Sequence, residues 1–146
     1  MILISHRGNI SGPEPSSENH PDYIKEALRL GYDCELDVWY KNDEWWLGHD
    51  EPLYSIDKAV LQNPKLWCHA KNVDALSAML SNNIHCFWHQ QDNYTLTSKG
   101  YIWTYPNKPL TKMSIAVCFD DTSLSLLDHD ITGICADHII QYIKGR

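Results

Sequence analysis

Short apolar runs alternate with amphipathic segments along the chain, and this pattern predicts the secondary structure. Apolar runs bounded by polar or turn-forming residues predict seven main strands, at 1–5, 32–40, 66–71, 84–89, 100–107, 114–121 and 131–139. Segments with apolar side chains on one helical face and a capping residue predict helices at 21–31, 55–64 and 72–83. Strands that alternate with helices are typical of an α/β fold with a mostly parallel sheet.

The second expected strand continues into a hairpin. Residues 41–43, Lys-Asn-Asp, are a turn signal, and the Glu-Trp-Trp-Leu-Gly that follows predicts a short return strand. In the second half of the chain, the connections between expected strands are too short for full crossover helices. With 146 residues, the chain has the length of one domain, which we take to span 1–146.

Two acidic residues interrupt the apolar run of the second strand. In the stretch CELDVWYKNDEWWLGHD, Glu35 and Asp37 are two positions apart, so a strand projects both side chains to the same face. Two buried carboxylates repel each other and lose hydration unless a cation lies between them. The pair therefore predicts a divalent metal site, and oxygen ligands favour Mg²⁺ or Ca²⁺. The alternative is a solvent-exposed pair on an edge strand, but the apolar neighbours favour burial.

Further reactive side chains follow the ends of other expected strands. His6 and Arg7 come after the first strand, His69 and Lys71 end the third, and His49 follows the hairpin. In folds with parallel strands, reactive residues lie at the carboxyl ends of the strands. Two histidines beside a metal make a general acid–base pair, and the two cations suit a phosphate. His69 is also a candidate third metal ligand, which would shift the preference towards Mn²⁺ or Zn²⁺.

Composition and charge narrow the range of partners. The formal net charge of −7 argues against a nucleic-acid surface, which needs an excess of basic residues. The five cysteines form no Cys-x-x-Cys pair, and we interpret them as reduced core thiols of a cytoplasmic protein. The N-terminal MILISHRG lacks the basic region of a signal peptide. No apolar run approaches the roughly 18 residues of a membrane span.

The ordered set of motifs resembles the glycerophosphodiester phosphodiesterases, a family of the phosphatidylinositol-phospholipase-C-like barrel superfamily. The resemblance rests on HRG, EN, ELDV and GHD between Ile4 and Pro52, with weaker matches in HAK, IWTYPN and GICADHI. It implies a compact or incomplete (β/α) TIM-type barrel with about seven parallel strands and a small β-hairpin after the second. A full barrel has about 250 residues, so a homo-oligomer would cover the open barrel edges.

The resemblance also implies a role for each matching residue. By this resemblance, His6 and His49 would be the catalytic pair, and Arg7 and Lys71 would bind the phosphate. Glu35 and Asp37 would bind the metal. Glu18 and Asn19 would lie near a substrate pocket. Trp103 is a candidate for the wall of a sugar or glycerol pocket, with core packing as the alternative. The chain departs from the family at His69, which replaces an acidic third metal ligand, and in CADHI, which lacks a terminal proline.

Together these residues predict a metal-dependent phosphodiesterase with one divalent metal. The enzyme would hydrolyse a small glycerophosphodiester-like or sugar-phosphodiester substrate by His/His general acid–base catalysis. One alternative is a catalytically inactive binding or regulatory module of the same family, which the short chain and His69 favour. Another is an unrelated α/β protein whose metal site supports a different hydrolysis. The joint presence of both histidines, both cations and both carboxylates favours the enzyme.

Overall fold

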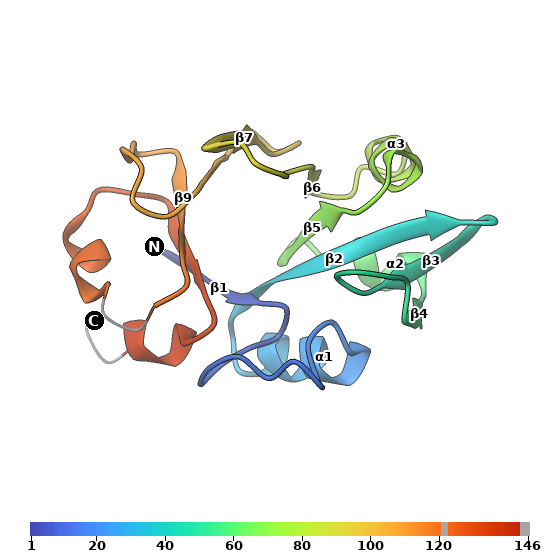
Figure 1. Ribbon diagram of the computed structural model, residues 1–146, viewed down its shortest axis with the longest axis horizontal. Helices are drawn as coiled ribbons and strands as arrows, with labels where there is room; N and C mark the ends of the chain where they lie inside the picture. Colours follow the sequence, from blue (N-terminus) through green and yellow to red (C-terminus); the bar gives the residue numbers. More distant parts are fainter. Residues whose placement is uncertain (121–122, 144–146) are drawn as a thin grey trace.

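A ten-stranded mixed β-sheet with a few short helices forms the part of the chain that the computed structural model describes, residues 1–120 and 123–143 (Figure 1). The strands are β1 (Ile2–His6), β2 (Asp33–Lys41), β3 (Glu44–Leu47), β4 (Tyr54–Ile56), β5 (Leu66–Ala70), β6 (Cys86–Phe87), β7 (Tyr94–Leu96), β8 (Ile102–Thr104), β9 (Ser114–Cys118) and β10 (Gly133–Ala136). The helices are α1 (Pro21–Arg29), α2 (Lys58–Leu61) and α3 (Val73–Ser81), with 3-10 helices η1 (Leu124–Asp128) and η2 (Ile139–Tyr142).

The centre of the sheet is parallel and its ends are antiparallel. Parallel pairing runs through β6, β5, β2, β1, β10, β9 and β8, whereas β2–β3–β4 and β7–β8 pair antiparallel. The nine residues of β2 let this strand pair with β1, β3 and β5. β1 and β5 run in the same direction as β2 and end beside its middle, with His6 opposite Glu35 and Ala70 opposite Val38, while β2 continues into the hairpin.

This architecture shows that the expectation of a (β/α) TIM-type barrel is wrong. Such a barrel places a helix after every strand, but the described residues contain only three α-helices, of nine, four and nine residues. In the same part of the chain, β6 pairs only with β5 and β7 only with β8. The short connections after β6 form turns, a hairpin and 3-10 helices instead of crossover helices, so the sheet is mixed and not uniformly parallel.

Local sequence signals account for the ends of the helices. Pro21 occupies the start of α1, where its missing N–H costs nothing. Asn72 caps α3 as its sequence position predicts. The helix expected at 55–64 is much shorter, because Ser55 pairs in β4 and Asp57 becomes the cap of α2. The hairpin expected after the second strand is present as β2–β3.

Alternating side chains divide β2 between two layers. Cys34, Leu36 and Val38 belong to a core cluster that packs against α1 and α3. Glu35 and Asp37 point to the opposite face of the strand. On that face a second apolar cluster fills the space between the central strands, formed by Ile4, Trp67, Phe87, Trp103, Ile115, Val117 and Cys135. The two carboxylates therefore lie beside a closely packed apolar layer, away from the helices.

Three further features of the described residues bear on the sequence predictions. All five cysteines are buried and free, as reduced core thiols require. In the described chain, no helix combines the length and the apolar character needed to cross a bilayer. The strand expected at 114–121 ends at Cys118, and residue 121 lies outside the described residues.

Candidate functional site

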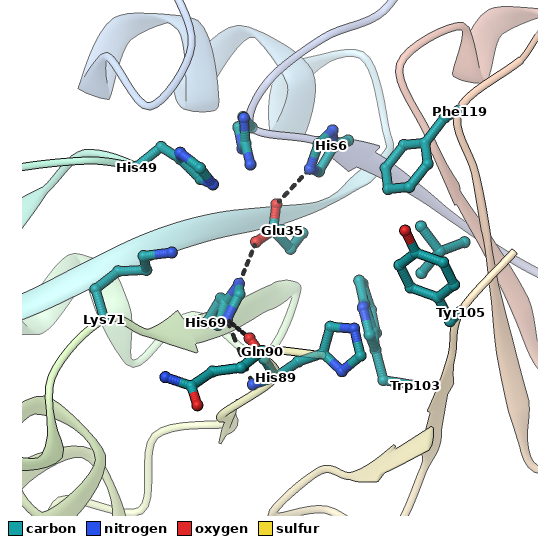
Figure 2. Close-up of a pocket in the computed structure, with 12 residues that line it drawn as sticks. His6, Glu35, His49, His69, Lys71, His89, Gln90, Trp103, Tyr105 and Phe119 are labelled. Carbon is teal, nitrogen blue, oxygen red and sulfur yellow. Dashed lines mark hydrogen bonds and ion pairs between the residues drawn. The ribbon is translucent and has the colours of Figure 1, made fainter. Parts of the chain in front are cut away.

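A cavity of about 290 Å³ opens at the carboxyl ends of β1 and β5, beside the first half of β2 (Figure 2). It brings together most of the residues that the sequence singles out, namely His6, Arg7, Glu35, His49, His69, Lys71 and Trp103. Asp37 lies directly behind this lining and is fully buried. Glu18 and Asn19 were expected near a substrate pocket, but they lie behind the cavity wall, in contact with Arg7 and Asp37 respectively.

Glu35, Asp37 and His69 form a compact group that could hold a metal ion. One ligand atom from each of them lies within 4.8 Å of the others. The parallel register of β2 and β5 sets Asp37 beside His69, which brings His69 Nδ1 to 3.4 Å from Asp37 Oδ1 and 3.7 Å from Glu35 Oε1. Figure 2 shows the imidazole and the Glu35 carboxylate turned towards each other. The sequence predicted the three residues, and the structure shows that they meet.

Two oxygen atoms of this group are buried without a hydrogen-bond partner in the part of the chain described by the structure. They are Glu35 Oε2 and Asp37 Oδ1, on side chains that are 2% and 0% exposed. A carboxylate oxygen that gives up water without a replacement partner is costly. A divalent cation would provide that partner, so the donor set fits a metal ion.

The two carboxylates differ in their electrostatic surroundings. Burial raises the pKa of Glu35, but the hydrogen bond with His69 and the charges of His6, His69 and Arg7 outweigh it and bring the pKa to about 2. Burial and the neighbouring charge of Glu35 raise the pKa of Asp37 above its ordinary value, against the opposing effect of Arg7. Glu35 therefore carries the more strongly stabilised negative charge of the pair.

A short loop after β1 holds Asp37 in place. Arg7 Nε lies 3.1 Å from Asp37 Oδ2. Asn19 Nδ2 donates a hydrogen bond of 2.8 Å to the same oxygen, and Asn19 Oδ1 accepts one of 2.8 Å from the backbone N–H of Asp37. Arg7 and Asn19 both adopt positive φ angles, 55° and 63°. Such backbone strain in residues other than glycine is typical of functional sites.

Steric crowding explains why the third residue of the HRG motif is glycine. Gly8 has a φ of +93°, and a Cβ atom there would lie 2.6 Å from Cδ1 of Tyr23 on α1. Only glycine permits both this conformation and this close approach. The loop can therefore turn sharply after His6 and Arg7, which leaves both side chains at the cavity.

A carboxylate orients His6. His6 Nδ1 lies 2.7 Å from Asp137 Oδ1, and Asn9 Nδ2 donates a 2.7 Å hydrogen bond to that same oxygen. Because a carboxylate only accepts, Nδ1 carries the proton, and Nε2 faces Glu35 Oε2 at 3.7 Å. Burial lowers the pKa of His6, but the hydrogen bond with Asp137 and the charge of Glu35 raise it above its ordinary value.

Asp137 had no assigned role in the sequence analysis. It lies in the GICAD run of the last expected strand and directly follows the observed β10, a position where reactive residues gather. Its position at the end of a strand is the sequence signal that could have identified Asp137. Its partner His6 lies 131 positions away, and only the β1–β10 pairing brings the two together.

His49 reaches the cavity from the loop after β3. Its side chain is 43% exposed, and Nδ1 lies 2.7 Å from Asp50 Oδ1, so this second histidine also has a carboxylate on Nδ1. The loop is tied to β2, because the backbone N–H of Gly48 donates to Asp37 O at 3.1 Å. Trp39 Nε1 donates to Gly48 O at 2.7 Å. The structure thus brings both predicted histidines to one cavity.

We expect Gly48→Ala to lower the free energy of unfolding by about 2–4 kcal/mol. A Cβ atom at Gly48 would lie 2.0 Å from Glu51 O, in a backbone with a φ of +153°. Gly100→Ala is the matched control, because Gly100 also has a positive φ but no atom lies near a Cβ there; its cost should be about 1 kcal/mol. Chemical denaturation of both variants measures the difference. Equal losses would mean that close packing does not fix the His49 loop.

The rest of the cavity divides into a cationic and an aromatic side. Lys71 Nζ lies 3.8 Å from Asp37 Oδ1, and Arg7 also lines the cavity. In Figure 2, His49 and Lys71 lie on one side of Glu35, and Trp103, Tyr105 and Phe119 lie on the other. Trp103 is buried and stacks on Phe87 at 4.6 Å, so it serves both the core and the cavity wall.

Two aromatic residues of the cavity, Tyr105 and Phe119, were not predicted from the sequence. Both are exposed at the rim, with their rings 6.2 Å apart in an edge-to-face arrangement. Phe119 also lies 6.0 Å from the ring of His6. Tyr105 lies within the IWTYPN segment, which the sequence had singled out. The sequence around Phe119 contains no signal that places this residue beside the first strand.

In comparisons with family models, with curated proteins and with solved structures, nothing matches the chain. The candidate function therefore rests on the residues of the cavity and their geometry.

Proposed function

We propose that the protein is a metal-dependent phosphodiesterase that hydrolyses a small glycerophosphodiester-like or sugar-phosphodiester substrate. One observation carries the proposal: two histidines, each with a carboxylate on Nδ1, line the same cavity as a buried Glu–Asp–His group and two cations. General acid–base chemistry, charge neutralisation and a metal site are the elements that phosphodiester cleavage needs.

The two cations would bind the phosphate. Arg7 offers a planar guanidinium group and Lys71 a compact ammonium group, and both side chains line the cavity. Both lie close to Asp37, at 3.1 and 3.8 Å. A divalent ion bound by Glu35, Asp37 and His69 would act as a Lewis acid on the phosphoryl oxygens. With the carboxylates occupied in that way, the positive charges of Arg7 and Lys71 would be available to the substrate.

The two histidines would move the protons. With the Nδ1 proton of His6 directed at Asp137, the Nε2 atom at the cavity can accept a proton in the neutral ring and donate one in the charged ring. His49 Nδ1 lies 2.7 Å from Asp50 Oδ1, an exposed pair that orients the ring less firmly than the buried Asp137 orients His6. One histidine would deprotonate the nucleophile, either water or a substrate hydroxyl, and the other would protonate the leaving oxygen. The aromatic side of the cavity would accommodate the alcohol moiety.

The experiment that tests the proposal is hydrolysis of bis(p-nitrophenyl) phosphate and of glycerophosphodiesters, with a divalent ion or with EDTA. We expect turnover that EDTA abolishes and that Glu35→Gln lowers by at least about 10²-fold, since the lost charge is part of the metal site. Circular dichroism controls for folding of the variant. A folded wild-type protein without turnover in any metal would contradict the proposal.

The second candidate is a catalytically inactive binding or regulatory module. The observation that favours it is the engagement of Arg7 with two carboxylates of its own chain, Asp37 at 3.1 Å and Glu18 at 3.3 Å. With Arg7 kept for these internal contacts, such a module would bind a phosphodiester through Lys71 and the metal group without cleaving it. Calorimetric titration with a glycerophosphodiester, followed by recovery of the unchanged compound, distinguishes the two candidates.

We further propose a cytoplasmic location, a small-molecule phosphodiester as partner and no nucleic-acid partner. The five buried free thiols support a reducing compartment, and the net charge of −7 is unfavourable for a nucleic-acid surface. A homo-oligomer would cover the exposed sheet edges, for example at β7, where Leu96 is exposed.

A further inference from the structure

We propose that the Glu35–Asp37–His69 site selects a transition-metal ion, Mn²⁺ or Zn²⁺, over Mg²⁺ and Ca²⁺, and that His69 is the residue that sets this preference. The inference deepens the proposed function by naming its metal. It rests on the metal site of that proposal and does not depend on turnover.

The hydrogen bonding of His69 makes Nδ1 available as a ligand. Nε2 lies 2.8 Å from the backbone carbonyl oxygen of His89, while the backbone N–H of His89 is farther away at 3.4 Å. A carbonyl oxygen only accepts, so the shorter contact places a ring proton on Nε2. Nδ1 faces the carboxylates at 3.4 and 3.7 Å, and a metal ion that displaced the proton on Nδ1 would meet its lone pair there.

The imidazole ring is also fixed in orientation. It stacks on Phe87, with the ring centres 5.1 Å apart and an interplanar angle of 16°. Metal-binding histidines typically donate their second ring N–H to a carbonyl or carboxylate, which sets both the tautomer and the ring plane. His89 O and Phe87 supply these two restraints here. His69 is therefore preorganised as a ligand and does not have to rotate into place.

The separations between the donor atoms suit one small ion. Two neighbouring ligand atoms on a metal with bonds of about 2.1 Å lie about 3 Å apart or slightly more. The two contacts of Nδ1 are only a little longer, and Glu35 Oε2 and Asp37 Oδ1 are buried without a partner in the described residues. Small shifts of the carboxylates would bring the set together.

The nitrogen donor is what separates the two classes of metal. Mg²⁺ and Ca²⁺ prefer oxygen ligands throughout, and Ca²⁺ prefers more of them. An imidazole nitrogen favours first-row transition metals, and among these Zn²⁺ binds more tightly than Mn²⁺. A neutral imidazole also brings no negative charge to the site, whereas a third carboxylate would, and a hard cation is held less strongly for that reason. Both effects act in the same direction.

The experiment measures metal affinity by isothermal titration calorimetry of the full-length, chelator-treated protein with Mn²⁺, Zn²⁺, Mg²⁺ and Ca²⁺. Divalent sites in general bind Zn²⁺ more tightly than Mg²⁺, so the decisive quantity is the ratio of affinities and its change in His69→Asp. We expect the wild-type protein to prefer Mn²⁺ and Zn²⁺ by at least roughly tenfold, and His69→Asp to reduce that ratio by roughly tenfold or more. His49→Gln, a histidine in the same cavity but outside the group, should keep the wild-type ratio.

A second readout reports on the ligand itself. Bound Co²⁺ has a visible absorption band that depends on its donor atoms, and we expect this band to shift in His69→Asp but not in His49→Gln. An unchanged ratio and an unchanged band in His69→Asp would overturn the inference. Absence of metal binding to the folded protein would overturn it together with the metal site of the proposed function. Selective Mn²⁺ or Zn²⁺ binding without hydrolysis would support the inference and contradict only the phosphodiesterase activity.

Discussion

Replacing His6 with glutamine is expected to lower kcat for phosphodiester hydrolysis by about 10²–10⁴-fold, the usual contribution of a positioned general acid or base. Glutamine can occupy the same place at the end of β1, and its amide can donate to Asp137 as His6 Nδ1 does at 2.7 Å. It cannot take up or release a proton near neutral pH. The loss should therefore appear in kcat, while metal affinity and the free energy of unfolding change little.

The measurement is steady-state kinetics of both proteins at saturating metal. His129→Gln is the control, because His129 is exposed beside η1 and lies outside the cavity. Its activity should equal that of the wild-type protein. If His6→Gln retained full activity, with its fold verified by circular dichroism, His6 would have no part in proton transfer.

The partner of His6 gives this prediction a pH signature. Asp137 raises the pKa of His6, so Asp137→Asn should move the ionisation of His6 to lower pH. If His6 is the base, activity rises as pH increases through its pKa, and this rise moves to lower pH in the variant. If His6 is the acid, activity falls through the same pKa, and the fall moves to lower pH. A pH–rate profile in which neither limb moves would exclude Asp137 as the residue that positions His6.

The sequence predicted the centre of the site because its signals are local. The alternation along β2 places Glu35 and Asp37 on one face whatever the sheet around them. The positions of His6 and His69 at strand ends are equally local, and the parallel pairing of β1, β2 and β5 brings them together. These features depend on one strand and its immediate neighbours.

The features that the sequence did not predict depend on contacts between distant segments. Asp137 meets His6 only because β10 pairs with β1, and Phe119 approaches the cavity only because of where β9 lies. The architecture expected from the sequence, a TIM-type barrel, was wrong for a related reason. Motifs at strand ends indicate that those strand ends share one site, but they do not require a helix after each strand, and the short later connections form hairpins and 3-10 helices instead.

The roles of Glu18 and Asn19 show the same limit at a smaller scale. The resemblance placed both near a substrate, because the EN motif follows HRG closely in the chain. In the structure, Asn19 hydrogen-bonds to Asp37 and Glu18 to Arg7. Both residues belong to the loop between β1 and α1, and from there they hold the charged residues Arg7 and Asp37 in place. No pattern in the sequence distinguishes a support from a residue that lines the cavity.

Replacing Arg7 with methionine is expected to lower the free energy of unfolding by about 2–4 kcal/mol at neutral pH, because it removes the closest cation of a buried carboxylate. Arg7 Nε lies 3.1 Å from Asp37 Oδ2. The side chain of Asp37 is fully buried, whereas that of Arg7 is 20% exposed, so we place the loss somewhat below that of a completely buried pair. Lys71 at 3.8 Å and the hydrogen bond from Asn19 limit it further.

The loss should depend on pH in a defined direction. Burial and the charge of Glu35 already raise the pKa of Asp37, and Arg7 opposes them. Without Arg7 the pKa rises further, so the folded state binds the proton of Asp37 more tightly than the unfolded state does. Stability of the variant then falls as pH increases through that pKa. We therefore expect a smaller deficit at mildly acidic pH than at neutral pH.

Chemical denaturation at the two pH values measures this deficit, and two further variants identify its cause. Arg29→Met removes an arginine from an exposed pair with Glu26 and should change stability little, because exposed pairs are screened by water. Arg7→Met combined with Asp37→Asn should recover most of the loss, since no buried charge is left without a partner. If the double variant were as unstable as the sum of its single variants, the deficit would arise from lost packing. The charge of Asp37 would then not be what requires a cation at this site.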